Sequence, residues 1–224
     1  MRLRTRNSTA TPTPYVVPPT ERFEGNDGSW STFYINVGSP DAQNFRVLVS
    51  IASSLIWVVG ENGCTPNDPS DCPDLRGIEN YAGTMSSGYN PSFSSSSPNS
   101  TEIGLYGLML EEDTTLSTIY GSQYSQIPAT FYKDVAGLGL GSSQSSLQLS
   151  GDVFATFMSK DIFLGEFGLG ISPYSFQGKD YPQTFLSGLV NTSEPIPSLS
   201  YGYTAGASYR KHHFHLLSNY SLSD

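Results

Sequence analysis

The sequence predicts a mainly β fold with one or two short helices. Runs rich in β-branched and aromatic residues, which favour strands, fill residues 30–60 and recur further along the chain. Gly, Pro, Ser and Asn gather between these runs and mark turns. Only residues 181–190, with Pro182 near their start, show a convincing helical turn. A chain of 224 residues is long enough for a hydrophobic core in one large or two small domains.

Residues 1–28 are predicted to be a disordered N-terminal extension. Prolines break any regular pattern there, at Pro12, Pro14, Pro18 and Pro19. Several arginines stand within residues 1–7, but no apolar run of roughly 7 to 15 residues follows them, so we identify no secretory signal. No stretch approaches the roughly 18 apolar residues of a membrane-spanning helix, and we expect no membrane contact.

The remaining elements are expected in a simple order. Three strands occupy residues 30–60, and the turn-rich residues 61–101 form an excursion over the surface. Gly104–Leu110 and Ala129–Val135 read as two further strands. Apolar and polar residues alternate within residues 147–164, which predicts one or two further strands before the short helix.

One predicted turn has an unusual centre. Residues 45–58 read Phe-Arg-Val-Leu-Val-Ser-Ile-Ala-Ser-Ser-Leu-Ile-Trp-Val, which indicates strand, tight turn and strand. This stretch resembles the first active-site loop of the pepsin-like aspartic peptidases, in which two apolar residues precede Asp-Thr-Gly-Ser-Ser. Ser50 stands at the aspartate position, Ile51 at the threonine and Ala52 at the glycine. The surroundings of the active-site loop are thus retained and its centre is replaced.

Further stretches resemble the same family, in the family's order. They are Ser31–Pro40, the pair Cys64 and Cys72, Tyr89–Ser95, Phe163–Gly170 and Ile196–Gly206. Tyr89–Ser95 resembles Phe-Asn-Pro-Ser-x-Ser-Ser, and Phe163–Gly170 resembles Asp-Gly-apolar-apolar-Gly-Leu-Gly. Glu166 departs from the pattern, since its position is apolar in the family. Ile196–Gly206 is similar to the strand that closes the first lobe in secreted fungal members.

The resemblance covers about residues 30–209 and implies a single pepsin-like β-barrel lobe, the N-terminal one, over residues 29–209. Residues 210–224 form a divergent tail. In the family, a second lobe brings the second catalytic aspartate in its own Asp-Thr-Gly, and this tripeptide occurs nowhere in the sequence. The resemblance therefore implies that both catalytic aspartates are absent. The degenerate site consists of Ser50, Ile51, Ala52, Ser53 and Ser54.

The chemical consequence of this loss can be estimated. Aspartic peptidases use two carboxyl groups that share one proton, one as base toward water and the other as acid. A serine hydroxyl such as that of Ser50 does not titrate near neutral pH, so it can hold a water but cannot take its proton. Losing one general acid–base group costs roughly 100- to 10,000-fold in rate. We therefore expect no peptidase activity from the chain as written.

Cys64 and Cys72 are eight positions apart in a proline-marked loop, which favours one small disulfide. Two free thiols are the alternative, and a structural zinc would need four ligands that do not gather nearby. His213 and His215 alternate and could face one ion, but no carboxylate or cysteine completes a site. We expect no metal and no cofactor.

The resemblance implies that residues 103–140 contain the flap, a β-hairpin that closes over substrate in this family. The resemblance gives two candidates for its substrate-contacting tyrosine, Tyr120 and Tyr106. A surface aromatic residue with no such role is the alternative for each.

The charge balance limits the partners. The chain has 20 acidic and 11 basic residues, a net charge of −9 and a sequence pI near 4.6. This balance argues against binding to nucleic acid or to an anionic membrane surface. The family is typically secreted, but the chain shows no signal from which to assign a compartment.

Three hypotheses for function stay open. The chain is an inactive aspartic endopeptidase-like protein that retains binding of an extended peptide, or a partial product of a larger secreted endopeptidase with no function of its own. The third is an active two-chain assembly, which Ser50 opposes because neither copy supplies an aspartate. A lone lobe would also expose a strand edge near residues 196–205, and we expect self-association through it.

Overall fold

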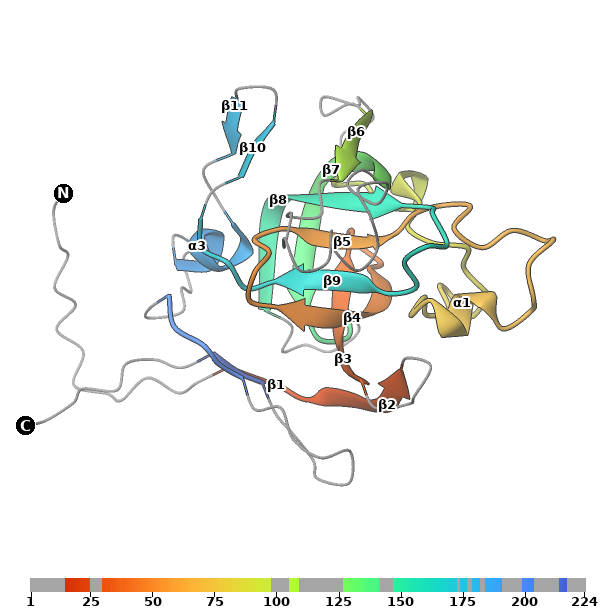
Figure 1. Ribbon diagram of the computed structural model, residues 1–224, viewed down its shortest axis with the longest axis horizontal. Coiled ribbons are helices and arrows are strands. Elements are labelled where there is room, and N and C mark those ends of the chain that lie inside the picture. Colours follow the sequence, from red (N-terminus) through yellow and green to blue (C-terminus); the bar gives the residue numbers. More distant parts are fainter. Residues whose placement is uncertain are drawn as a thin grey trace, which may run out of the picture.

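The computed structural model describes residues 15–24, 30–97, 105–108, 127–141, 147–172, 174–176, 179–181, 184–190, 199–203 and 214–216. Strands dominate these residues, as the sequence predicts, and two short helices accompany them. The centre is a closed barrel of six strands. In barrel order these are β3 (Trp30–Val37), β4 (Gln43–Ser50), β9 (Gly165–Gly168), β5 (Ile56–Val59), β8 (Leu147–Phe157) and β7 (Ile127–Leu138) (Figure 1).

The barrel closes where β7 pairs with β3, with Ile35 opposite Leu138. Both side chains are buried, as are Val37 and Ala136 further along the same pairing. Burying one large aliphatic side chain fully contributes about 1.5 to 3 kcal/mol. The apolar residues that alternate along the strands therefore hold the barrel together as well as setting its register.

The pairing around β9 is less predictable from local sequence. β9 lies between β4 and β5, parallel to β4 and antiparallel to β5. Its register sets Val47 opposite Gly165 on one side and Ile56 opposite Phe167 on the other. Two strands joined by one turn are thus separated in the sheet by a strand from far along the chain.

A β-hairpin forms where the sequence predicts one. β6 (Leu105–Leu108) pairs with the beginning of β7 in antiparallel register. β7 and β8 form the longest ladder, with a shift in register between Asp134 and Ala136. A second hairpin joins β10 (Tyr174–Phe176) to β11 (Lys179–Tyr181).

The buried Asp134 on β7 fastens the Tyr89–Ser95 stretch to the barrel. Its carboxylate accepts hydrogen bonds from Tyr89 Oη at 2.8 Å, from Ser94 Oγ at 3.0 Å and from Ser96 Oγ. A short 3₁₀ helix, η1 (Pro91–Phe93), lies in this stretch, where the Asn90 side chain accepts from Ser92 N at 2.9 Å. Part of the surface excursion is therefore tied down by buried polar contacts.

The helix expected after Pro182 is α3 (Phe185–Val190). It begins three residues later because Thr184 Oγ1 accepts from Ser187 N at 3.3 Å, as an N-terminal cap does. Phe185 packs edge-on against Phe167 of β9 with ring centroids 5.3 Å apart. The second helix, α1 (Cys72–Leu75), is only one turn long and was not predicted.

The prediction of disorder over residues 1–28 is wrong for residues 15–24. β1 (Tyr15–Val17) pairs with β13 (Phe214–Leu216), and β2 (Pro19–Glu24) pairs with β3. Proline is tolerated at the first position of a strand, which is where Pro19 stands. β13 also pairs with β12 (Gly202–Tyr203), so part of the tail of residues 210–224 belongs to a three-stranded sheet.

Arg46 explains how β2 and α1 are attached to the barrel. Its side chain is only 1% exposed, and its guanidinium donates to the carboxylates of Glu24, Asp74 and Glu79. The hydrogen bond to Glu24 is 2.8 Å long. A buried guanidinium is tolerated because several carboxylates compensate its charge.

Candidate functional site

The residues predicted to form a degenerate site make up the turn between β4 and β5, at the left of the barrel in Figure 1. Ser50 ends β4, and its Oγ accepts hydrogen bonds from Ala52 N at 3.3 Å and Ser53 N at 3.2 Å. Ile51 and Ala52 form the exposed tip, and the Ile51 side chain is 70% exposed. The serine at the aspartate position thus closes the turn on itself, as short polar side chains do in tight turns.

The turn rests directly on the end of β9. Leu169 N donates to Ser50 O at 2.8 Å, and Gly170 N donates to Ser53 O at 2.7 Å. A Cβ atom on Gly168 would lie 2.6 Å from Ser53 O, and one on Gly170 would lie 2.4 Å from Ser54 Oγ. Both glycines are therefore needed for the backbone of the turn to approach β9 this closely.

Ser53 and Ser54, which match the family's Ser-Ser, have different surroundings. Ser53 Oγ accepts from Leu55 N at 3.2 Å and donates to Leu55 O at 3.4 Å. Both serines are half-buried, while the tip residues before them are exposed. Ser53 therefore stabilises the second half of the turn as Ser50 stabilises the first.

Glu166 of β9 places a carboxyl group beside this turn. Its register partners are Leu48 on β4 and Trp57 on β5. Alternate residues of a strand share a face, so Glu166 lies on the same face as Leu48 and Ser50. Burial raises the pKa of Glu166, and interactions with the side chains of Ser50, Ser53 and Trp57 lower it by less. The departure from the family's pattern at this position is visible in the sequence, but its contact with the turn is not.

Among the described residues, this turn does not have the two neighbouring carboxyl groups of an aspartic dyad. No charged side chain in the described ranges contributes to the pKa shift of Glu166, so no second carboxylate there shares its proton. Ser50 accepts from two backbone N–H groups and has no basic group to offer. The turn can accept and donate hydrogen bonds, but it offers no pair of groups to act as base and acid together.

The two flap candidates are not brought to the turn by any described contact. Tyr106 lies on β6 at the register position opposite Ala129 of β7. Tyr120 lies outside the described residues. The role of either tyrosine stays a prediction.

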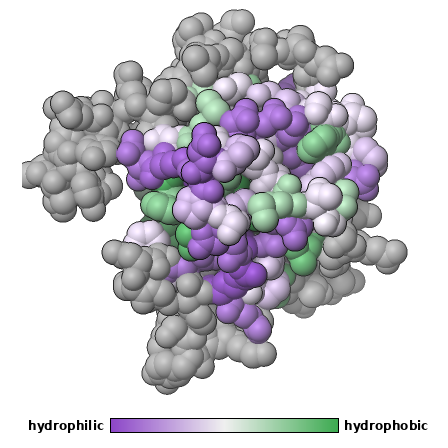
Figure 2. Space-filling view, turned by 90° about the vertical axis from the view of Figure 1, so that its right-hand side faces the viewer, coloured by the Kyte–Doolittle hydropathy of each residue, from purple (hydrophilic) through white to green (hydrophobic). Residues whose placement is uncertain are grey.

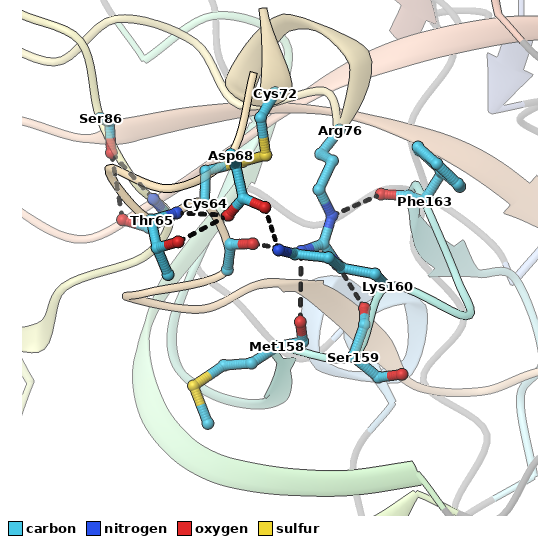
Figure 3. The surroundings of a disulfide bond; sticks show 12 residues. Cys64, Thr65, Asp68, Cys72, Arg76, Ser86, Met158, Ser159, Lys160 and Phe163 are labelled. Atoms are coloured by element: carbon cyan, nitrogen blue, oxygen red, sulfur yellow. Dashed lines mark hydrogen bonds and ion pairs between the residues drawn. A yellow bond between two sulfur atoms is a disulfide. The ribbon is translucent and has the colours of Figure 1, made fainter. Parts of the chain in front are cut away.

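The predicted disulfide between Cys64 and Cys72 is confirmed. It lies in the loop that carries α1, at the right of Figure 1, whereas the Ser50 turn lies at the left. Lys160 forms an ion pair with Asp68 of this loop, and Thr65 N donates to the same carboxylate at 2.7 Å (Figure 3). The hydrogen bond from Lys160 is the main reason why the pKa of Asp68 is lowered to about 2.

Arg76, which follows α1, is a buried cation that sequence reasoning missed. It is 2% exposed, and its guanidinium carbon lies 5.3 Å from the centre of the Phe157 ring. It donates to one main-chain carbonyl beside the disulfide loop, Gly63 O at 2.6 Å. It also donates to four carbonyls of a segment far along the chain, namely Ser159 O at 2.6 Å, Ile162 O at 3.1 Å, Met158 O at 3.3 Å and Phe163 O at 3.4 Å (Figure 3). Arg76 thus joins the disulfide loop to residues 158–163. Nothing in the local sequence signals this role.

On the face that carries α1, the described residues form no continuous apolar surface (Figure 2). Polar residues dominate this face, and the apolar ones form small separate patches (Figure 2). This pattern is ordinary for a solvated surface and does not mark a docking site.

Within the parts of the chain that the structure describes, no group of three or more His, Cys, Asp or Glu side chains could hold a metal ion. Of the histidines considered above, His215 lies on β13, opposite Val16 and Gly202, and His213 lies outside the described residues. Among those same residues, no helix is long and apolar enough to cross a membrane.

Neither the models of known protein families nor the curated proteins give a match to this chain. The resemblance to pepsin-like peptidases therefore rests on the motifs quoted above.

Proposed function

We propose that this chain is a pepsin-like N-terminal lobe without peptidase activity, and that it binds an extended peptide at the turn between β4 and β5. The main support for the proposal is the way in which the Ser50 hydroxyl group is hydrogen-bonded. Its Oγ accepts from Ala52 N and Ser53 N and so completes the turn. A hydroxyl held in this way cannot take a proton from water at the place where the family has an aspartate.

The peptide-binding part of the proposal is supported by the exposed groups around the turn. Ile51 is 70% exposed and Ile171, just beyond β9, is 52% exposed. Both side chains offer apolar area to a ligand. The hydroxyl groups of Ser50 and Ser53 lie in the same turn as Ile51. Extended peptides gain affinity from main-chain hydrogen bonds and specificity from contacts to alternate side chains.

The binding test is a titration of a labelled peptide that has blocked ends and no ionisable side chain. We expect Ile51→Ser to weaken binding about 5- to 30-fold, because one aliphatic side chain loses roughly 1 to 2 kcal/mol of burial. Met85→Ser is the matched control, since Met85 is 66% exposed and lies in a different loop. It should leave the affinity within about twofold.

The outcomes separate the hypotheses. A folded protein that binds no extended peptide would overturn the binding function and favour a partial product with no function of its own. The variant Ser50→Asp should gain no peptide hydrolysis, because the carboxyl group that the family's second lobe supplies from the opposite side would still be missing. Hydrolysis by this variant would instead favour an assembly in which two copies each supply one carboxylate.

A further inference from the structure

Glu166 places a titratable group against the proposed binding turn. It is half-buried, opposite Leu48 of β4 and Trp57 of β5, and close to the side chains of Ser50 and Ser53. Gly168, the next residue of β9 on the same face, has no side chain, and the backbone of Ser53 and Leu55 packs on it. The carboxyl group and the turn therefore form one polar cluster at the end of β9.

The two protonation states of Glu166 offer different hydrogen bonds. As a carboxylate it is only an acceptor, and it competes with a ligand for the hydroxyl hydrogen of Ser50. As a carboxylic acid it has a hydrogen to donate, and it no longer draws the hydroxyl hydrogen of Ser50 away from a peptide. A negative charge also repels the carbonyl oxygens of a peptide backbone, whereas the neutral acid does not.

Among the described residues, no other charged group contributes to the pKa of Glu166. The turn contributes only the hydroxyls of Ser50 and Ser53, and β5 contributes the indole of Trp57. On β4, Arg46 shares the face of Leu48 but is paired with carboxylates on β2 and around α1. Burial, which raises the pKa of Glu166, acts without compensation from a cation among the described residues.

We propose that Glu166 makes peptide binding at the β4–β5 turn acid-dependent, so that an uncharged extended peptide binds the protonated form and is released when the carboxyl group ionises. This inference rests on the proposed function, since it concerns the regulation of the same site. In this role Glu166 controls binding through its protonation state and takes part in no catalytic step.

The test compares the affinity of the wild-type chain and of Glu166→Gln for the same uncharged peptide between about pH 4 and about pH 8. We expect the wild-type dissociation constant to rise at least about tenfold across this range, which is about 1.4 kcal/mol of binding free energy. Glu166→Gln, which stays neutral, should keep a nearly constant affinity. Asp41→Asn, at an exposed position shortly before β4 begins, is the control and should follow the wild type. Circular dichroism at each pH ensures that only folded protein is compared.

The outcomes distinguish this inference from the proposed function. If the peptide binds with the same affinity at every pH, or if Glu166→Gln keeps the wild-type dependence, the role of Glu166 is refuted and binding at the turn stands. If no peptide binds at any pH, both fail. Should Glu166→Gln not fold, the carboxyl signal of Glu166 in the wild-type chain can be titrated by nuclear magnetic resonance. Bound peptide must raise its pKa, and an unchanged pKa would refute the inference.

Discussion

Replacing Asp152 by asparagine is expected to remove most of the pH dependence of the protein's stability. Asp152 lies on β8, opposite Asp134 of β7, and is 5% exposed. Burial raises its pKa from 3.8 to about 7, and the hydrogen bond from Val153 N only partly opposes this. The folded protein therefore holds this proton at pH values where the unfolded chain has released it.

The sign and size of the effect follow from this difference. Between 3.8 and about 7 the folded state binds more protons than the unfolded state, so the free energy of unfolding falls as the pH rises. At about 1.4 kcal/mol per pH unit, the loss attributable to Asp152 reaches about 4 kcal/mol. This loss of stability is absent below the unfolded-state pKa of 3.8 and complete above the folded-state pKa of about 7. The raised pKa of Glu166 acts in the same direction, so the variant keeps a smaller residual slope.

Urea unfolding followed by tryptophan fluorescence at several pH values measures this directly. Asp152→Asn should match the wild type within about 1 kcal/mol near pH 4 and exceed it by up to about 4 kcal/mol near pH 8. Asp41→Asn, an exposed position, is the control and should behave like the wild type. Parallel curves for wild type and Asp152→Asn over the whole range would refute the reasoning.

Further predictions concern the disulfide loop and the sheet edge. Arg76→Met should lower the free energy of unfolding by about 3 kcal/mol or more, because five main-chain carbonyls lose their donor. Arg76→Lys should recover less than half of this, and full recovery in urea unfolding would contradict the account. Reducing the disulfide between Cys64 and Cys72 should cost about 2 to 3 kcal/mol, and an unchanged melting temperature would argue against it. β12 lies at an edge of its sheet among the described strands, so light scattering should reveal self-association. A monodisperse monomer would count against the lobe assignment.

Much of the barrel could be predicted because its signals are local. Apolar residues recur along β3 and β4 and form one continuous run in β5. The hairpin pairs β6 with β7, which is the next strand in the sequence. The disulfide followed from the spacing of Cys64 and Cys72. Each of these features depends on residues within a few positions of one another or on one tight turn.

The missed features depend on contacts between distant residues. The neighbours of Glu166 come from β4, β5 and their turn, more than a hundred positions earlier. Arg46 and Arg76 look like ordinary surface cations in the sequence, since buried arginine is rare without partners that only the fold supplies. Pro19 indicates a break locally, yet pairing with β3 places it at the start of a strand. Helix α1 is too short for a periodic signal and lies between the disulfide and Arg76.

The central proposal is that, among the residues that the structure describes, no pair of carboxyl groups at the Ser50 turn can activate water. Its most direct test is the cleavage of a denatured protein substrate by the purified chain near pH 3.5, with and without a transition-state inhibitor of aspartic peptidases. An active aspartic peptidase assayed alongside establishes the sensitivity. The account predicts no cleavage that the inhibitor suppresses. Inhibitor-sensitive turnover by the chain, at a rate that increases with its concentration, would contradict it.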